Sequence, residues 1–280
     1  MTVARHGIST EHVGSGLAML GEDLAVDLER LGPGASLGLV SVLETALVIA
    51  EAGLLLDPAG ERPETREAFL TAAQAAGALF AVAGAPEGPV TARIGDAVRT
   101  VAAGDSRREA HAGNWLAAFW LAAVCREDGL LDALAELPVR VLRESGVPEE
   151  EYLYAWVTAL RAYRRQDPLW ERELAAAEAA AGSELAGLGD REHLVKVVRP
   201  AMEVFRRYAE GDGPGLEASL VRALELHREY WTADAERAAS STGFVALAPL
   251  AVACLARDAG LRVEVASEYL PAALVAGGRA

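Results

Sequence analysis

The sequence predicts an all-α protein in which antiparallel helical hairpins pack into one compact array, with at most one short pair of strands. Three observations predict this fold class. Apolar residues recur at helical spacing through nearly all of the 280 residues, while the alternation typical of strands is nearly absent. Gly and Pro interrupt the helical pattern at short intervals, as turns between helices require. Apolar residues form 52% of the chain, which is enough to bury a large core.

Helices are predicted one after another along the chain. The apolar spacing places them over residues 15–31, 35–56, 63–83, 110–127, 130–142, 149–166, 169–181, 191–210, 215–239 and 243–259. Residues 90–101 fit either a helix or a short hairpin. Residues 262–266, with the sequence RVEVA, are the best strand candidate, although five residues alone cannot form a sheet. We expect a flexible N-terminal segment over residues 1–14 and a single domain over residues 15–275, because no long polar linker divides the latter.

Two stretches predict helix pairs joined by tight turns. Residues 114–138 place a Trp-bearing helix before an Ala/Leu helix that ends at Pro138, and residues 205–227 place a Gly-rich turn between two helices. Small residues where helices cross are typical of tetratricopeptide-like pairs, although no strict repeat period appears. A tetratricopeptide-like array is therefore one form that the predicted hairpins could take.

The compartment is predicted from one apolar run and from the cysteines. Residues 37–56 have membrane-spanning length, but Glu44 and Glu51 interrupt them on one helical face, so we expect a buried helix with a solvent-facing stripe. The first fourteen residues lack the apolar core of a signal peptide. Cys125 and Cys254 each lie in an apolar helical run, where a free thiol behaves as a small hydrophobe. These features favour a cytoplasmic, reducing location and no membrane contact.

The charge balance limits the class of partner. The chain carries 26 Lys and Arg against 41 Asp and Glu, which gives a net charge of −15. Because phosphate contacts need clustered cations, this acidity argues against direct binding of nucleic acid or of an anionic membrane. It favours either a basic protein partner or simple solubility. The high apolar content also leaves open a homodimer that buries one helical face.

Residue patterns for chemistry are weak throughout the chain. No histidine has a second His or Cys at metal-ligand spacing, and the turn at residues 211–215 lacks the ending of a phosphate-binding loop. The sequence therefore predicts no catalytic residue, no cofactor and no metal. One enzymatic alternative remains, in which His227 acts as a general acid–base with Glu225 or Glu229. The simpler interpretation is a helix end that Trp231 anchors in the core.

Two helix starts have local signals. Asn114 is predicted to cap the helix that follows it, and Trp115 and Phe119 are predicted to pack into the core at i,i+4 spacing. The acidic run at residues 149–151 is predicted to complement the dipole at the start of its own helix.

Three stretches carry a resemblance to a known family. GNWLAAFWLAAVCRE (113–127), EYLYAWVTAL (151–160) and a tail with HREYWTADAER (227–237), GFVALAPLAVACLARDAG (243–260) and SEYLP (267–271) resemble the immunity 49 family of bacterial polymorphic-toxin systems, over about residues 15–275. The resemblance implies a single all-helical domain that is not an enzyme. It also implies neutralisation of a cognate toxin domain by binding. Many such toxins are nucleases with a basic groove, into which an acidic inhibitor would be steered electrostatically.

The acidic and aromatic end of the helix near residue 230 is the predicted partner-binding site. Polar side chains there suit a protein interface, and Tyr230 would serve as an aromatic anchor. The predicted contact residues are Glu229, Tyr230, Asp234, Glu236 and Arg237. The main alternative to an immunity protein is a tetratricopeptide-like adaptor that binds a peptide or protein in a concave groove.

Overall fold

The all-α prediction is confirmed. The computed structural model describes residues 1–32, 38–85, 88–101, 105–182 and 191–277, with only the backbone described for Asp105 and Ser106. Its first half contains α1 (Val13–Arg30), α2 (Gly38–Gly53), α3 (Pro63–Gly84), β1 (Val90–Ile94), β2 (Ala97–Val101), the 3-10 helix η1 (Asp105–Glu109), α4 (Ala112–Cys125), α5 (Asp128–Glu136) and α6 (Val139–Arg143). Its second half contains α7 (Glu151–Arg164), α8 (Trp170–Gly182), α9 (Arg191–His193), the π-helical turn η2 (Leu194–Val198), α10 (Arg199–Ala209), α11 (Gly213–Trp231), α12 (Ala235–Ala239), the 3-10 helix η3 (Ser241–Phe244), α13 (Leu247–Asp258) and α14 (Ala272–Ala276).

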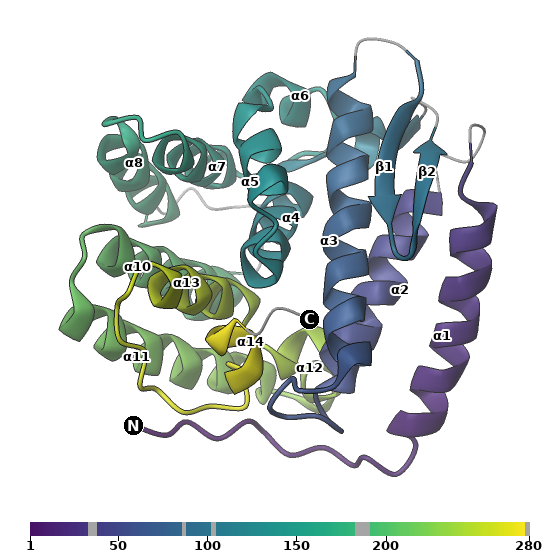
Figure 1. The fold of residues 1–280 in the computed structure, drawn as a ribbon. Coiled ribbons are helices and arrows are strands. Elements are labelled where there is room, and N and C mark those ends of the chain that lie inside the picture. Colours follow the sequence, from purple (N-terminus) through teal and green to yellow (C-terminus); the bar gives the residue numbers. More distant parts are fainter. Residues whose placement is uncertain (33–37, 86–87, 102–104, 183–190, 278–280) are drawn as a thin grey trace.

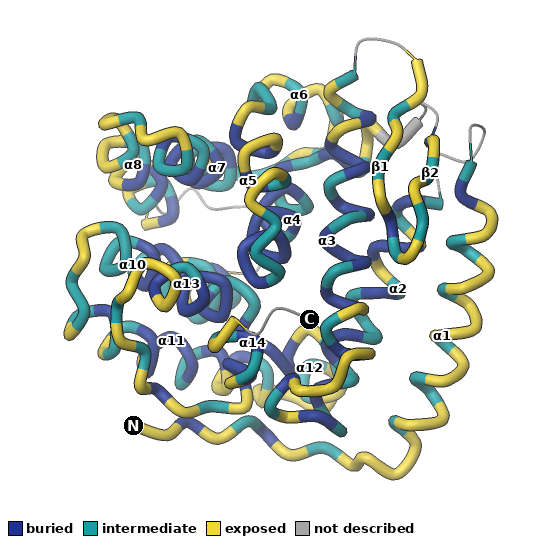
Figure 2. Tube along the Cα trace, viewed as in Figure 1, coloured by how far each residue is buried: buried dark blue, intermediate teal, exposed yellow. Residues whose placement is uncertain are grey.

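Consecutive helices pack in pairs around α4. The pairs are α2 with α3, α7 with α8, and α10 with α11, while α1 packs on the outside of α2 (Figure 1). Helix α4 contacts α3 on one side and α13 on another, and it also contacts α5 and α7. Buried residues face this centre, and exposed residues lie on the outer surfaces of α1, α8 and α11 (Figure 2). The predicted helical pairs are therefore present.

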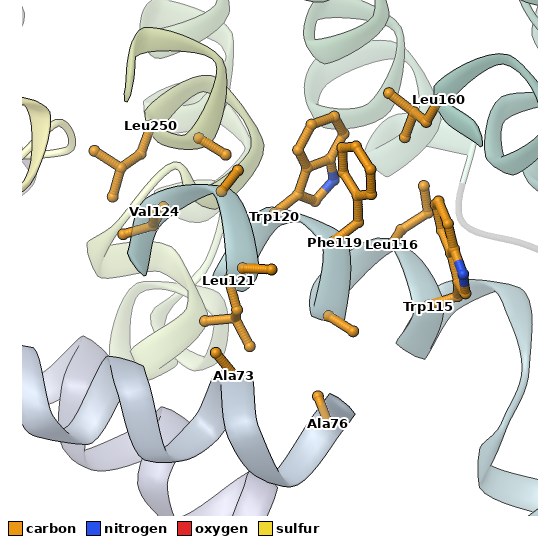
Figure 3. Packing of buried hydrophobic residues seen from close by; sticks show 14 of the residues in the cluster. Ala73, Ala76, Trp115, Leu116, Phe119, Trp120, Leu121, Val124, Leu160 and Leu250 are labelled. Atoms are coloured by element: carbon orange, nitrogen blue, oxygen red, sulfur yellow. The ribbon is translucent and has the colours of Figure 1, made fainter. Parts of the chain in front are cut away.

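The side chains of α4 form the middle of the core. Its apolar residues lie between α3, which presents Ala73 and Ala76, and α13, which presents Leu250 (Figure 3). The spacing of packed helices depends on side-chain size at the contact, so the small alanines allow α3 to approach closely. An apolar sequence on every side of α4 is what a helix buried on every side requires.

A chain of aromatic rings connects α4 with two other helices. Trp115 stacks on Phe119 with ring centroids 5.2 Å apart, as the spacing predicted. Trp120 contacts Trp156 of α7 at 5.9 Å, and Trp156 contacts Phe205 of α10 edge-on at 5.2 Å. Edge-on and offset contacts of this kind add to the stabilisation from burial alone. The relative positions of α4, α7 and α10 are set by these rings.

The start of α4 is held by a carboxylate from a distant loop. Glu149 accepts hydrogen bonds from the backbone N–H groups of Ala112 (2.6 Å) and Gly113 (2.8 Å), and its Oε1 lies 3.0 Å from Nδ1 of His111. Burial raises the pKa of Glu149, but these hydrogen bonds outweigh burial and lower the pKa below its ordinary value. A Cβ on Gly113 would lie 3.1 Å from the same carboxylate, which explains the glycine.

One prediction for a helix start is therefore wrong, and another is right only in part. Asn114 is not the cap of α4, because the capping residue is His111, whose imidazole accepts the backbone N–H of Asn114 at 3.4 Å. The side-chain amide of Asn114 donates instead to the carbonyl of Glu109 at 2.9 Å. Of the acidic run at residues 149–151, Glu150 and Glu151 lie at the start of α7 as predicted, but Glu149 precedes that helix and its carboxylate caps α4.

Residues 90–101, which fit a helix or a hairpin, form a hairpin. Strands β1 and β2 are antiparallel, with Val90 opposite Val101 and Ile94 opposite Ala97. The two-residue turn has Gly95 at its first position with φ +66°, a conformation that favours glycine. Its N–H donates to the side chain of Gln74 on α3 at 2.8 Å, which fixes the hairpin against the helical core.

The N-terminal segment packs against the domain, in contrast to the expectation that residues 1–14 form a flexible segment outside it. Thr2 forms an isolated parallel bridge with Ala266, so residues 262–266 contribute one bridge to this segment and do not form a strand of a sheet. Val3 is 4% exposed. Arg5 donates to the carbonyl of Leu54 at 2.9 Å. The segment runs beneath α11 and α12 before it reaches α1 (Figure 1).

This segment closes a buried polar cluster that we call the polar joint. It brings together the N-terminal segment, α2, the end of α11, η3 and the residues before α14. Its members are His6, Glu51, His227, Ser241, Gly243 and Tyr269. Nδ1 of His6 lies 2.8 Å from the hydroxyl of Tyr269, Nε2 of His227 lies 3.1 Å from the carbonyl of Gly243, and Ser241 donates to Glu51 at 2.7 Å.

The position of Glu51 corrects the predicted solvent-facing stripe. Glu44 is exposed, as predicted, but Glu51 is only 2% exposed because η3 covers it. Burial raises the pKa of Glu51 to about 7, although the hydrogen bond from Ser241 opposes the shift. Burial also lowers the pKa of His227 to about 4, so its imidazole is neutral at neutral pH. The polar joint therefore contains two groups whose charged forms are disfavoured.

Two helical stretches are long and apolar enough to cross a membrane. Among the described residues these are Pro63–Gly84, which is α3, and Ser241–Asp258, which covers η3 and α13. In each, 61% of the most apolar window is buried against the rest of the protein. The core helices of a folded domain show the same composition, and both stretches contact α4.

Gly243 provides a first test of the polar joint. A Cβ there would lie 2.9 Å from the indole ring of Trp231, so we expect Gly243→Ala to lower the free energy of unfolding by about 1–3 kcal/mol. Gly21→Ala is the control, because nothing lies within 4 Å of its Cβ position in α1. There we expect stabilisation of about 0.5–1 kcal/mol from helix propensity. Urea unfolding measures both, and wild-type stability of Gly243→Ala would contradict the close contact.

The pH dependence of stability tests the burial of Glu51. Because its folded pKa lies above its unfolded value of 4.5, its protonated form stabilises the protein at low pH, and this contribution is lost as pH rises toward 7. Glu51→Gln keeps a side-chain oxygen that can accept the hydrogen bond from Ser241, and it removes the titration. Between pH 4.5 and 7.5 we expect the free energy of unfolding of the variant to rise by about 3 kcal/mol relative to that of the wild type.

The matched control is Glu44→Gln, which is exposed on the same helix. Its stability should follow that of the wild type at every pH, measured by urea unfolding at half-unit steps. A constant difference between Glu51→Gln and the wild type over this range would show that Glu51 is not buried as described.

Candidate partner-binding surface

The predicted site lies at a corner between two helices. Residues 215–239 were predicted as one helix, but α11 ends at Trp231 and α12 begins at Ala235. The correction has a local cause, since Asp234 has extended backbone and its carboxylate accepts the N–H of Arg237 at 2.8 Å, which starts a new helix. Thr232 closes the preceding helix by donating its hydroxyl to the carbonyl of Arg228 at 2.7 Å.

Ion pairs connect this corner to the neighbouring helix. Arg237 pairs with Glu192 of α9 at 2.8 Å and with Asp234 at 3.4 Å. Lys196 of η2 pairs with Glu192 at 2.9 Å and reaches Glu229 of α11 at 3.7 Å. The hydrogen bonds from Lys196 and Arg237 lower the pKa of Glu192. Such exposed pairs stabilise a protein little, but a network of them restricts the side chains to defined positions.

Tyr230 lies beneath this network rather than at the surface. It is 8% exposed, and the guanidinium of Arg237 lies 4.2 Å from the centre of its ring. The imidazole of His193 also contacts the ring of Tyr230, with the two ring centroids 5.2 Å apart. Tyr230 was predicted to anchor an interface, but other residues of the protein already cover its ring. In the structure Tyr230 supports Arg237 by a cation–π contact.

The remaining predicted residues share one exposed surface, which we call the corner surface. It consists of Glu192, Lys196, Glu229, Asp234, Glu236 and Arg237, with four carboxylates against two cations. The side chains of Glu229 and Asp234 are each 52% exposed. Glu236 is exposed and has no hydrogen bond or ion pair among the described residues.

His227 lies behind the corner surface and has a structural environment. It is 5% exposed, and its Nε2 pairs with a backbone carbonyl rather than with Glu225 or Glu229. Glu229 is directed to Lys196, and Glu225 lies 3.7 Å from Arg222. The carboxylate–imidazole pair of the enzymatic alternative is therefore not formed among these residues.

A groove next to the corner surface was not predicted. It has a volume of about 360 Å³ and lies between α8, η2, α10 and α11. We call it the α10–α11 groove and define it by Val195, Arg199, Glu203, Ser219, Arg222 and Leu226. The sequence held one signal for it, because Pro200 interrupts the helix predicted over residues 191–210.

The π-helical turn next to this groove follows from that proline. Pro200 has no N–H to donate, and its ring crowds the carbonyl one turn before it. The N–H of Arg199 bonds to the carbonyl of Leu194, which is one residue further than in an α-helix. The helix therefore widens over Leu194–Val198, at the place where Val195 and Lys196 face the two neighbouring surfaces.

The cysteines and metal-ligating residues suggest no chemistry. In the described part of the chain, no group of three or more His, Cys, Asp or Glu side chains could hold a metal ion. Cys125 and Cys254 are free thiols, and burial raises the pKa of each to about 12. Thiols that ionise so reluctantly are poor nucleophiles at neutral pH.

Comparison with known proteins identifies a family. The family model described as Immunity protein 49 matches residues 57–274, which include α3 to α13, the corner surface and most of the polar joint. Neither the curated proteins nor the solved structures gave a match. The matched region covers more than three quarters of the 280 residues. The chain therefore belongs to the Immunity protein 49 family.

Proposed function

We propose that this protein neutralises a cognate toxin of a bacterial polymorphic-toxin system by binding it in the cytoplasm, without catalysing a reaction. The observation that carries the proposal is the family match over residues 57–274, since membership gives the chain an immunity role in general. The toxin that fits best has a basic surface, as nucleases have around their substrate. The net charge of −15 supports this choice, because it would attract such a surface over a long range.

The corner surface is the proposed contact site. Its exposed carboxylates are Glu229, Asp234 and Glu236, and the ion pairs of Arg237 and Lys196 hold the first two in place. Side chains that are ordered before binding lose less conformational entropy when a partner arrives. The acidic side chains would first speed association and then pair with Lys or Arg of the toxin.

Co-expression tests the proposed function. The protein is produced together with the C-terminal toxin domain encoded beside its gene, and growth of the host is scored. We expect growth to be rescued, and a stable complex to be recovered from the rescued cells. Growth arrest in the presence of the folded protein, with no complex in the purified mixture, would contradict the proposal for that toxin.

Charge reversal tests the corner surface. We choose Glu229→Lys with Glu236→Lys and leave Asp234 in place, because Asp234 also caps α12. At low salt we expect the association rate with the toxin to fall by about tenfold, and we expect the difference to shrink as salt screens the charges. Stopped-flow mixing at several salt concentrations measures this rate.

The control for charge reversal has the same change in net charge. Glu22→Lys with Asp23→Lys alters two exposed carboxylates on α1, which lies beyond α3 and α2 from α12 in Figure 1. If both double variants slow association equally, overall charge and not the corner surface governs the encounter. If neither does, the corner surface takes no part in binding.

A further inference from the structure

The α10–α11 groove has a chemistry opposite to that of the corner surface. We propose that it binds an acidic segment of a protein partner that also carries an aliphatic side chain. The inference rests on the proposed function, which makes that partner the toxin. The groove would be a second contact site on the protein, and it would select an acidic segment. Neither family membership nor the net negative charge of the protein predicts such a site.

The two walls of the groove come from neighbouring helices. Ser219, Arg222 and Leu226 follow one another at helical spacing along α11 and line one wall. Val195 of η2 and Arg199 of α10 lie four residues apart and line the other wall. The volume of about 360 Å³ suits a few side chains of an extended or helical segment rather than a whole domain.

An aliphatic contact is available in this groove. Val195 is 44% exposed, whereas the preceding residue Leu194 is only 4% exposed. The widened turn before Pro200 changes the direction of the side chains that follow Leu194. Val195 therefore faces the groove beside Leu226, where an aliphatic side chain of a partner would remove both from water.

Positive charge is available in the same place. Two carboxylates line the groove, those of Glu178 and Glu203, and both are already paired. Glu178 accepts two hydrogen bonds from Arg206. Glu203 pairs with Arg207 at 2.7 Å. The side chain of Arg222 is 62% exposed and lies 3.7 Å from Glu225. Arg199 is exposed, and its guanidinium has no hydrogen bond or ion pair among the described residues.

Arginine is suited to carboxylate ligands. Its planar guanidinium donates two parallel hydrogen bonds to one carboxylate, with a geometry that lysine lacks. Arg199 and Arg222 stand on opposite walls of the groove, so an acidic segment that lies between them can meet both. A basic segment would meet the same two cations and is disfavoured by repulsion.

The groove and the corner surface adjoin along α11. Arg222, Leu226 and Glu229 are separated by four and three residues, so they lie in one row on that helix. The row changes from basic to acidic within two turns. A partner with an acidic segment beside a basic surface matches both parts in one orientation only, and reversed docking sets like charges against each other.

The first experiment measures affinity for the toxin domain. Isothermal titration compares the wild type with Arg199→Glu and Arg222→Glu together, and with Val195→Asp alone. We expect each variant to weaken binding by about tenfold or more, because a charge pair or an apolar contact is lost. Thermal unfolding of each variant confirms that the fold is retained. Arg30→Glu with Arg93→Glu is the control, since both residues are exposed on the side of the molecule that carries α1 and β1.

A second experiment separates the groove from the proposed function. Fluorescence anisotropy measures binding of the labelled hexapeptides DELLDE and KKLLKK to the wild type and to the groove variants. We expect the wild type to bind DELLDE and not KKLLKK, and the arginine double variant to lose DELLDE.

Each combination of results decides the proposal. If the toxin binds and the groove variants match the wild type, the groove proposal is overturned while the proposed function stands. If the toxin does not bind the wild type, the proposed function fails for that toxin. Loss of DELLDE binding in the arginine variant would then keep the groove as a site for acidic segments. An absence of DELLDE binding to the wild type would overturn the groove proposal, whatever the result with the toxin.

Discussion

The rest of the structure depends on the burial of α4 on every side. Water leaves the whole surface of this helix only if several other helices cover it at once, and α3, α5, α7 and α13 do so. The aromatic rings from Trp115 to Phe205 make this cover specific, because large flat side chains fit in few arrangements. The outer helices α8 and α11, and with them both candidate surfaces, are positioned by helices that touch α4.

The residues that carry the family resemblance are mainly architectural. Gly113 gives space to the carboxylate of Glu149, and Trp115 donates its indole N–H to the carbonyl of Leu134 at 3.2 Å. Gly243 gives space to Trp231, and Tyr269 binds His6 in the polar joint. Fold-determining side chains of this kind explain why distinctive sequence motifs contain no catalytic pattern.

Local patterns predicted most of the helices and the packing of α4. Apolar periodicity depends on the neighbouring turns of one helix, so the sequence alone shows it. Even the boundary between α11 and α12 has a local cause in Asp234, but a helical pattern on both sides concealed it.

Distant contacts account for what the sequence did not predict. Glu51 looked solvent-facing because η3, which covers it, is 190 residues away along the chain. Tyr230 looked available for a partner because its cover by Arg237 requires the turn at the corner. The α10–α11 groove depends on how α8, α10 and α11 meet. The sequence indicated only the break in the helix before Pro200.

The polar joint has a consequence for how the chain folds during synthesis. The ribosome makes Thr2, Val3 and His6 long before their partners Ala266 and Tyr269, because His6 and Tyr269 are 263 residues apart along the chain. Contacts between such distant residues form late, because a very long loop must close. The early residues therefore lack these partners until the segment with Ala266 and Tyr269 has been made, and only then can His6 reach Tyr269 in the polar joint. Closure of the joint is thus a late step, which follows synthesis of the segment that carries Tyr269.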